Sequence, residues 1–104
     1  MKTVTVKLLD FTKIPGGRFR IHGKGSAEAF YEEHLLDILN TNPDKLIIDF
    51  TGTWGAGPSF ISQLTIYLQG FYGNKSVVKQ RVTPVATGNP QVINDFWEKL
   101  EELS

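Results

Sequence analysis

Residues 45–50, KLIIDF, form a nearly unbroken apolar run of strand length. A run of this kind is typical of a strand that is covered on both faces, as in a parallel or mixed sheet packed under helices. We therefore predict that residues 45–50 are the central strand of the fold. Turn residues bound this strand, with Asn42-Pro43-Asp44 before it and a glycine-rich connection over residues 52–57 after it.

Two further strands are predicted upstream, because apolar and polar residues alternate there. Residues 3–10 alternate in this way, and residues 18–22 place Phe19 and Ile21 on one side and basic or imidazole side chains on the other. Pro15-Gly16-Gly17 is a turn signal between the two segments. We therefore expect these segments to be placed for a hairpin.

A helix is predicted over residues 26–40. Ser26 follows a glycine-rich break and is a suitable N-cap, because its hydroxyl can accept from a free N–H group of the first turn. The apolar stripe of this helix consists of Ala27, Tyr31, Leu35 and Ile38. Four acidic residues are interpreted either as a solvated face or as a docking face for a basic partner: Glu28, Glu32, Glu33 and Asp37.

Three more elements are predicted downstream. Pro58 and Ser59 open a helix that runs to about Tyr72, since proline fits the first helical turn. Residues 81–87 form a strand that Pro84 places at a sheet edge, and Asn89 caps a last helix. The buried stripe of that helix consists of Val92, Ile93, Phe96, Trp97 and Leu100. The order β-β-α-β-α-β-α predicts an α/β fold in one domain over residues 1–104, with a single small mixed sheet of about four strands covered by three helices.

The composition excludes several classes of function. The sequence carries 11 Lys or Arg and 11 Asp or Glu, so its charge gives no reason to expect nucleic acid or an anionic membrane as a partner. It has no cysteine, which excludes disulfides, thiolate nucleophiles and the usual structural zinc sites. Residues 1–4 begin no signal-peptide segment, and no run reaches the ~18 apolar residues of a membrane span. We therefore expect a cytoplasmic protein.

The candidate site follows the central strand, in the long uncharged stretch of residues 51–74. The helix in this stretch is apolar on most sides and is interpreted either as core or as an interface with a partner or a second copy. The loop before it leads from the carboxyl end of a strand to a helix N-terminus, where sites of open α/β sheets lie. Free N–H groups there favour a phosphate ester on Ser59 or a bound anion, or else Ser59 has only a helix-start role. Trp54 either packs on the core or is a binding hot spot.

The sequence carries little that points to catalysis. His22 and His34 are its only histidines, and neither has the spacing of a metal ligand or a triad. Asp49 lacks a base partner, and we find no nucleophile–base pair and no carboxylate dyad. Gly55-Ala56-Gly57 lacks the rest of a phosphate-loop motif. We therefore predict a protein that is not an enzyme and that uses no cofactor or metal.

The stretch LIIDFTG at residues 46–52, followed by GPSF at 57–60 and preceded by GSAEAF at 25–30, resembles the bacterial STAS-like domain family of unknown function. This family is similar to the STAS domains of anti-sigma factor antagonists, and the resemblance covers roughly residues 18–72. It implies a small mixed sheet with helices, no catalysis, a kinase-type anti-sigma partner and a switch by serine phosphorylation at a strand–helix junction. The positions that match are Asp49, Gly52, Gly57, Ser59 and Phe60.

The chain departs from the family at two positions. Pro58 stands at the classical phospho-acceptor position, the first of two adjacent serines, so that only the second serine, Ser59, remains as a candidate acceptor. Gln63 stands where an acidic residue is expected. We therefore expect a regulatory protein-interaction domain whose partner is a kinase-type anti-sigma factor or a second copy in a homodimer. The expected binding residues are Trp54, Gly55, Gly57, Pro58, Ser59, Phe60 and Gln63. The alternative is a small-ligand or nucleotide-sensing module that binds an anion near Gly57–Ser59.

Overall fold

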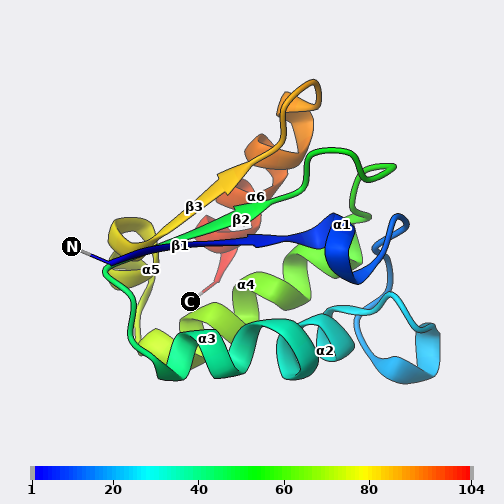
Figure 1. The fold of residues 1–104 in the computed structure, drawn as a ribbon. Helices are drawn as coiled ribbons and strands as arrows, with labels where there is room; N and C mark the ends of the chain where they lie inside the picture. The colour runs from blue at the N-terminus through cyan, green and yellow to red at the C-terminus, as the bar shows by residue number, and fades with distance from the viewer. Residues whose placement is uncertain (1, 104) are drawn as a thin grey trace.

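The computed structural model describes residues 2–103. Within them a three-stranded parallel sheet has the order β1-β2-β3 (Figure 1). The strands are β1 (Thr3–Lys7), β2 (Lys45–Asp49) and β3 (Val82–Val85). The predictions of a central strand at KLIIDF and of an edge strand around Pro84 are therefore confirmed. The sheet is parallel throughout, so the prediction of a mixed sheet is wrong, and Leu46 of β2 is in register with Val4 and Val82.

The helical elements follow the strands and pack on the sheet. The described chain contains α1 (Leu8–Phe11), the 3-10 turn η1 (Arg20–His22), α2 (Ala27–Phe30), the π-helical turn η2 (Tyr31–Leu35), α3 (Leu36–Asn40), α4 (Pro58–Tyr72), α5 (Lys75–Arg81) and α6 (Pro90–Glu102). The segments α2, η2 and α3 form one continuous helical stretch. It begins as predicted, because the Ser26 hydroxyl accepts from the Ala29 N–H at 3.2 Å.

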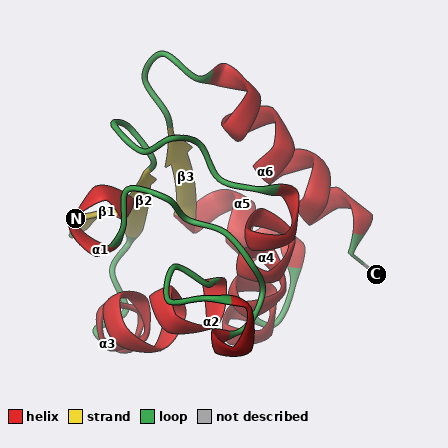
Figure 2. Ribbon diagram, turned by 90° about the vertical axis from the view of Figure 1, so that its right-hand side faces the viewer, coloured by secondary structure: helices red, strands yellow, loops and turns green. Residues whose placement is uncertain are grey.

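The helices cover one face of the sheet. Figure 2 shows α2, α3, α4 and α6 on the same side of the strands. Leu46 and Ile48 are buried on that side, whereas Thr5 and Thr83 are exposed and Ile47 is half-buried on the other. The prediction that β2 is covered on both faces is therefore wrong. Most outward positions of the strands carry threonine or charged residues, which tolerate contact with water, and the apolar exceptions Ile47 and Val85 are half-buried.

The predictions for the N-terminal quarter are wrong in two respects. The strand predicted over residues 3–10 ends at Lys7 and gives way to α1, and residues 18–22 form a turn rather than a strand. The N–H groups of this turn are used locally instead of in a ladder. Phe19 donates to His22 Nδ1, Arg20 donates to Glu28, and the His22 N–H donates to the Phe19 carbonyl. There is consequently no hairpin, and the described sheet has three strands rather than four.

The second half of the chain contains a helix that the sequence did not predict. Gly73 ends α4 at φ 91°, and Asn74 then caps α5 by accepting from the Val77 N–H at 2.9 Å. Only Val78 is fully buried on α5, so this helix has no apolar stripe to detect. The helices therefore outnumber the three that were predicted.

The core lies between the sheet and the helices. On α4 the fully buried hydrophobic residues are Phe60, Ile61, Leu64 and Leu68, because α2 and α6 pack against this helix. These residues belong to the core, whereas Pro58, Ser59, Ile66 and Phe71 of the same helix are exposed. On α6 the predicted stripe is confirmed in part, with Val92, Phe96 and Leu100 buried and with Ile93 and Trp97 half-buried against the core. Within residues 2–103 no helix has the length and apolar character needed to cross a bilayer.

Candidate functional site

The candidate site lies at the carboxyl end of the sheet, on the right of Figure 1. Because the strands are parallel, their three following connections meet at this end. Hydrogen bonds join the connection after β2 to the connections after β1 and β3. The Trp54 N–H donates to the Lys13 carbonyl at 2.9 Å, and the Thr87 N–H donates to the Thr51 hydroxyl at 2.9 Å.

The connection after β2 has a defined shape because its own polar groups bond within it. The Asp49 carboxylate accepts from the Thr51 N–H at 2.9 Å. The Thr53 hydroxyl donates to the Phe50 carbonyl at 2.7 Å and accepts from the Gly55 N–H at 3.3 Å. Asp49 therefore helps to orient this loop.

The two residues that matter most for the predicted surface are accessible. The Trp54 side chain is 74% exposed, although its backbone is held by the bond to Lys13. Ser59 is exposed at the second position of α4, after Gly57 and Pro58. Trp54 therefore does not pack on the core, and neither side chain is sealed inside the molecule.

Two predicted binding residues lie beneath the surface instead of on it. Phe60 is fully buried, with its ring centroid 6.1 Å from that of Phe30. Gln63 is 7% exposed, and its Oε1 accepts from the Arg18 guanidinium at 3.4 Å. Both residues support the site from below, so we leave them out of the contact surface.

Arg18 is a site residue that the sequence analysis missed. It extends from the connection after β1 to α4, where its Nη1 donates to the Ser62 hydroxyl at 3.3 Å as well as to Gln63. Ser59 precedes Ser62 by three residues, so both lie on the same helix face. The guanidinium is thus one helical turn from Ser59. No local pattern could have revealed this pairing, because Arg18 and Ser62 are 44 residues apart.

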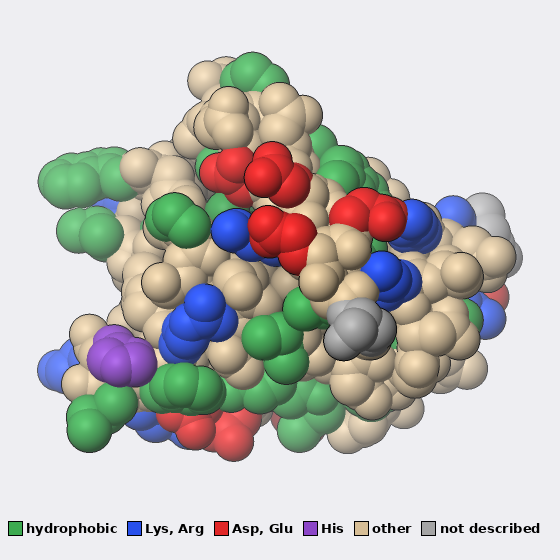
Figure 3. All heavy atoms as spheres, turned by 180° about the vertical axis from the view of Figure 1, so that it is seen from behind, with side chains coloured by type: hydrophobic (Ala, Val, Ile, Leu, Met, Phe, Trp, Pro, Cys, Tyr) green, Lys and Arg blue, Asp and Glu red, His purple; other side chains and the backbone are tan. Residues whose placement is uncertain are grey.

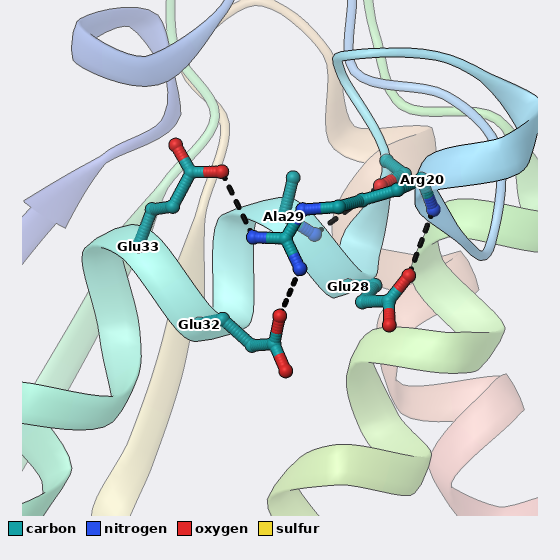
Figure 4. A network of polar contacts seen from close by, with 6 residues as sticks. Arg20, Glu28, Ala29, Glu32 and Glu33 are labelled. Carbon is teal, nitrogen blue, oxygen red and sulfur yellow. Dashed lines mark hydrogen bonds and ion pairs between the residues drawn. The ribbon is translucent and has the colours of Figure 1, made fainter.

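The connection after β1 is fastened to the helical stretch by a second arginine (Figure 4). The Arg20 guanidinium is ion-paired with Glu32 and, at 3.0 Å, with Glu33, while the Arg20 N–H donates to Glu28 at 2.8 Å. The hydrogen bonds that the guanidinium donates to Glu32 and then to Glu33 raise the pKa of Arg20 further above its ordinary value. Three of the four acidic residues interpreted as a solvated or docking face therefore bind a residue of their own chain.

Both histidines contact other residues of the chain. The His34 ring lies 4.9 Å from the Phe11 ring and 6.3 Å from the Phe30 ring, measured between centroids. His22 Nδ1 accepts from the Phe19 N–H at 3.3 Å. Among residues 2–103 no group of three or more His, Cys, Asp or Glu side chains is arranged to hold a metal ion.

We compared the chain with family models, with curated proteins and with solved structures, and none of them matches it.

Proposed function

We propose that the chain is a non-catalytic regulatory domain that binds another protein through the loop surface at the carboxyl end of its sheet. The observation that carries this proposal is Trp54, a large aromatic side chain exposed on a loop whose backbone is fixed by internal hydrogen bonds. Tryptophan is enriched among binding hot spots, and a loop that is already ordered loses little entropy on binding.

The proposed contact surface comprises Trp54, Gly55, Gly57, Pro58 and Ser59. All five are exposed or half-buried and follow one another along the chain. The resemblance to STAS domains supports the same location, and it suggests a kinase-type anti-sigma factor of a bacterial cytoplasm as the partner.

Ser59 is the proposed regulatory position. Its side chain is exposed, and the first turn of α4 contains no acidic residue that would repel a phosphate. A phosphoserine in a first helical turn is stabilised by the free N–H groups and the helix dipole. Arg18 lies on the same helix face, so the phosphate would have a cation within one turn. Phosphorylation would place up to two negative charges five residues from Trp54 along the chain and thereby change partner binding.

The test compares capture of proteins from a native extract by the unmodified chain and by Trp54→Ala. Phe71→Ala is the matched control, because Phe71 is an aromatic residue that is 37% exposed at the far end of α4. We expect a defined protein to be retained by the unmodified chain and by Phe71→Ala and lost with Trp54→Ala. Both variants should unfold within about 0.5 kcal/mol of the parent, as surface substitutions do. Equal capture by all three chains would contradict the proposal.

The phosphorylation step has its own test. Incubation with a kinase-type anti-sigma factor, followed by intact-mass analysis, should add one phosphate that Ser59→Ala removes. Phosphate found only on Thr51 or Thr53 would contradict this part of the proposal and leave the binding surface standing.

One observation favours a second function, which is the binding of a small anion such as a nucleotide at the start of α4. The N-cap residue is Gly57, and no side chain caps the first-turn N–H groups. Such groups attract anions. Calorimetric titration with nucleotides should then give saturable heat, whereas a flat titration of the folded protein would exclude this function.

A further inference from the structure

Large hydrophobic side chains are exposed mainly at one end of the molecule. Seven are exposed within residues 2–103, and five of these lie in the connections after β1 and β2. We call these five the apolar end: Leu9, Ile14, Phe19, Ile21 and Trp54. The most exposed are Ile21, at 90%, and Trp54, at 74%. Seen from behind, hydrophobic side chains lie at the upper and lower left of the molecule, with His and Lys or Arg side chains between them (Figure 3).

The apolar end also carries cations. Residues 11–27 contain four Lys or Arg side chains and no Asp or Glu: Lys13, Arg18, Arg20 and Lys24. Asp10 is the single acidic residue in the connection between β1 and α2. Arg20 already has negative partners, because it is ion-paired with Glu32 and Glu33. The cations of this connection that could meet a partner are therefore Lys13, Arg18 and Lys24.

Three of these cations lack a negative partner. Lys13 and Lys24 are exposed and form no ion pair in the part of the chain that the structure describes. Arg18 is half-buried, and its printed partners, Ser62 and Gln63, are both neutral. A guanidinium that is partly withdrawn from water and bonded only to neutral groups gains strongly from a carboxylate.

We propose that the apolar end binds an acidic segment of the partner protein, in which carboxylates alternate with aromatic or aliphatic residues. This inference rests on the proposed function and adds the chemistry of the partner. Apolar side chains of the segment would pack on Trp54 and Ile14, and its carboxylates would meet Arg18, Lys13 and Lys24. A partner of this composition complements both the charge and the exposed apolar area of the surface.

An anionic membrane would also offer negative charge to this surface, but the position of Arg18 favours a protein. A flat bilayer would touch the protruding Ile21 and Trp54 side chains. It would not reach a half-buried guanidinium that lies against α4, whereas a carboxylate side chain of a bound peptide can do so. A membrane is therefore an outcome that the experiment must be able to detect.

The experiment selects peptides from a random display library on the immobilised full chain. We expect enrichment of peptides in which Asp or Glu stands next to Trp, Phe or Leu. An enriched peptide, made synthetically and titrated by calorimetry, should bind about tenfold or more weakly to Trp54→Ala and to Arg18→Gln. Its affinity should fall as salt rises. Phe71→Ala and Lys79→Gln are the controls for loss of an exposed aromatic and of an exposed cation elsewhere, and both should leave the affinity unchanged.

The outcomes separate the two proposals. Enriched peptides that depend on Trp54 but are neutral or basic would overturn the acidic partner and leave the proposed function standing. A library that yields no peptide dependent on Trp54 would count against both. Sedimentation with phosphatidylserine vesicles that is lost in Trp54→Ala and in Arg18→Gln would replace the protein partner by a membrane and overturn the inference.

Discussion

The two ends of the sheet differ in how much large hydrophobic surface the chain leaves exposed, because five of the seven exposed large hydrophobic residues follow β1 and β2 at the carboxyl end. At the amino end, polar groups bond to other parts of the chain. The Lys2 N–H donates to the Asp44 carboxylate at 2.7 Å, and the Lys45 ammonium donates to the Gln80 carbonyl at 2.6 Å. α5 covers this end beside the N-terminus (Figure 1).

At the carboxyl end the chain leaves both charge and apolar area without partners. Lys13 and Lys24 have no ion pair among the described residues, Arg18 bonds to neutral groups, and Trp54 and Ile21 face water. Both ends are made from the same three strands, so the difference comes from the connections. This difference supports the proposal that a partner protein binds at the carboxyl end.

The largest expected effect tests whether the carboxyl end stands on a rigid support. Phe60→Ala should lower the free energy of unfolding by about 3–5 kcal/mol, because it removes a fully buried aromatic side chain directly beneath the proposed surface. Chemical denaturation measures this loss, with Trp54→Ala as the control that should change stability by about 0.5 kcal/mol or less. A Phe60→Ala variant of unchanged stability would show that Phe60 is not a core residue.

A smaller effect is expected at Gly52, where the loop after β2 turns. Gly52 has φ 87°, and a Cβ atom there would lie 2.9 Å from a Leu9 methyl carbon. Gly52→Ala should therefore destabilise the fold by about 1–2 kcal/mol, the usual cost of a left-handed conformation for a residue with a side chain. Leu9 can move aside, so the backbone conformation accounts for most of this cost.

Gly70→Ala provides the matched control for Gly52→Ala. Gly70 lies inside α4 with no atom within 4 Å of an added Cβ, and alanine there should stabilise the helix by about 0.5–1 kcal/mol. Thermal unfolding of both variants should thus move in opposite directions. A stabilising Gly52→Ala would mean that the loop can adopt another conformation, and the rigid support for Trp54 would be lost.

The smallest effect is expected at the amino end and depends on pH. The Lys2 N–H holds the pKa of Asp44 below its ordinary value. A carboxyl group whose folded pKa is lowered adds stability above its unfolded pKa, and that contribution disappears as the pH falls through the folded pKa. Asp44→Asn should therefore lower Tm slightly at neutral pH and leave it equal to that of the parent in strong acid. A difference in Tm that persists in acid would show that the amide changes packing rather than charge.

The parts of this fold that could be predicted are those with local signals. The apolar run at 45–50, Pro58 before α4 and Pro90 before α6 each marked an element that the structure contains. The turn at 18–22 could not be distinguished from a strand, because Phe19 and Ile21 alternate as a half-buried strand would. The segment forms a turn because the Arg20 N–H donates to the carboxylate of Glu28, which belongs to a different element.

The site was predicted in position but not in composition. Trp54 and Ser59 are exposed where the end of β2 suggested, since the carboxyl edge of a parallel sheet is a general location for sites. Phe60 and Gln63 were placed on the surface because a helix that is apolar all round does not reveal which side its neighbours cover. Arg18 was missed because its contact with α4 joins residues far apart in the sequence.

The most direct test of the account locates the contact on the molecule. The chain labelled with ¹⁵N is titrated with the captured partner, or with an enriched acidic peptide, and its amide and indole signals are followed by NMR. We expect the largest changes at the Trp54 indole N–H and at the Gly55 and Ser59 amides, with the signals of Asn74 and Lys75 at the amino end unmoved. Changes concentrated at Ile66 and Phe71, with Trp54 unaffected, would contradict the assignment of the carboxyl end as the binding surface.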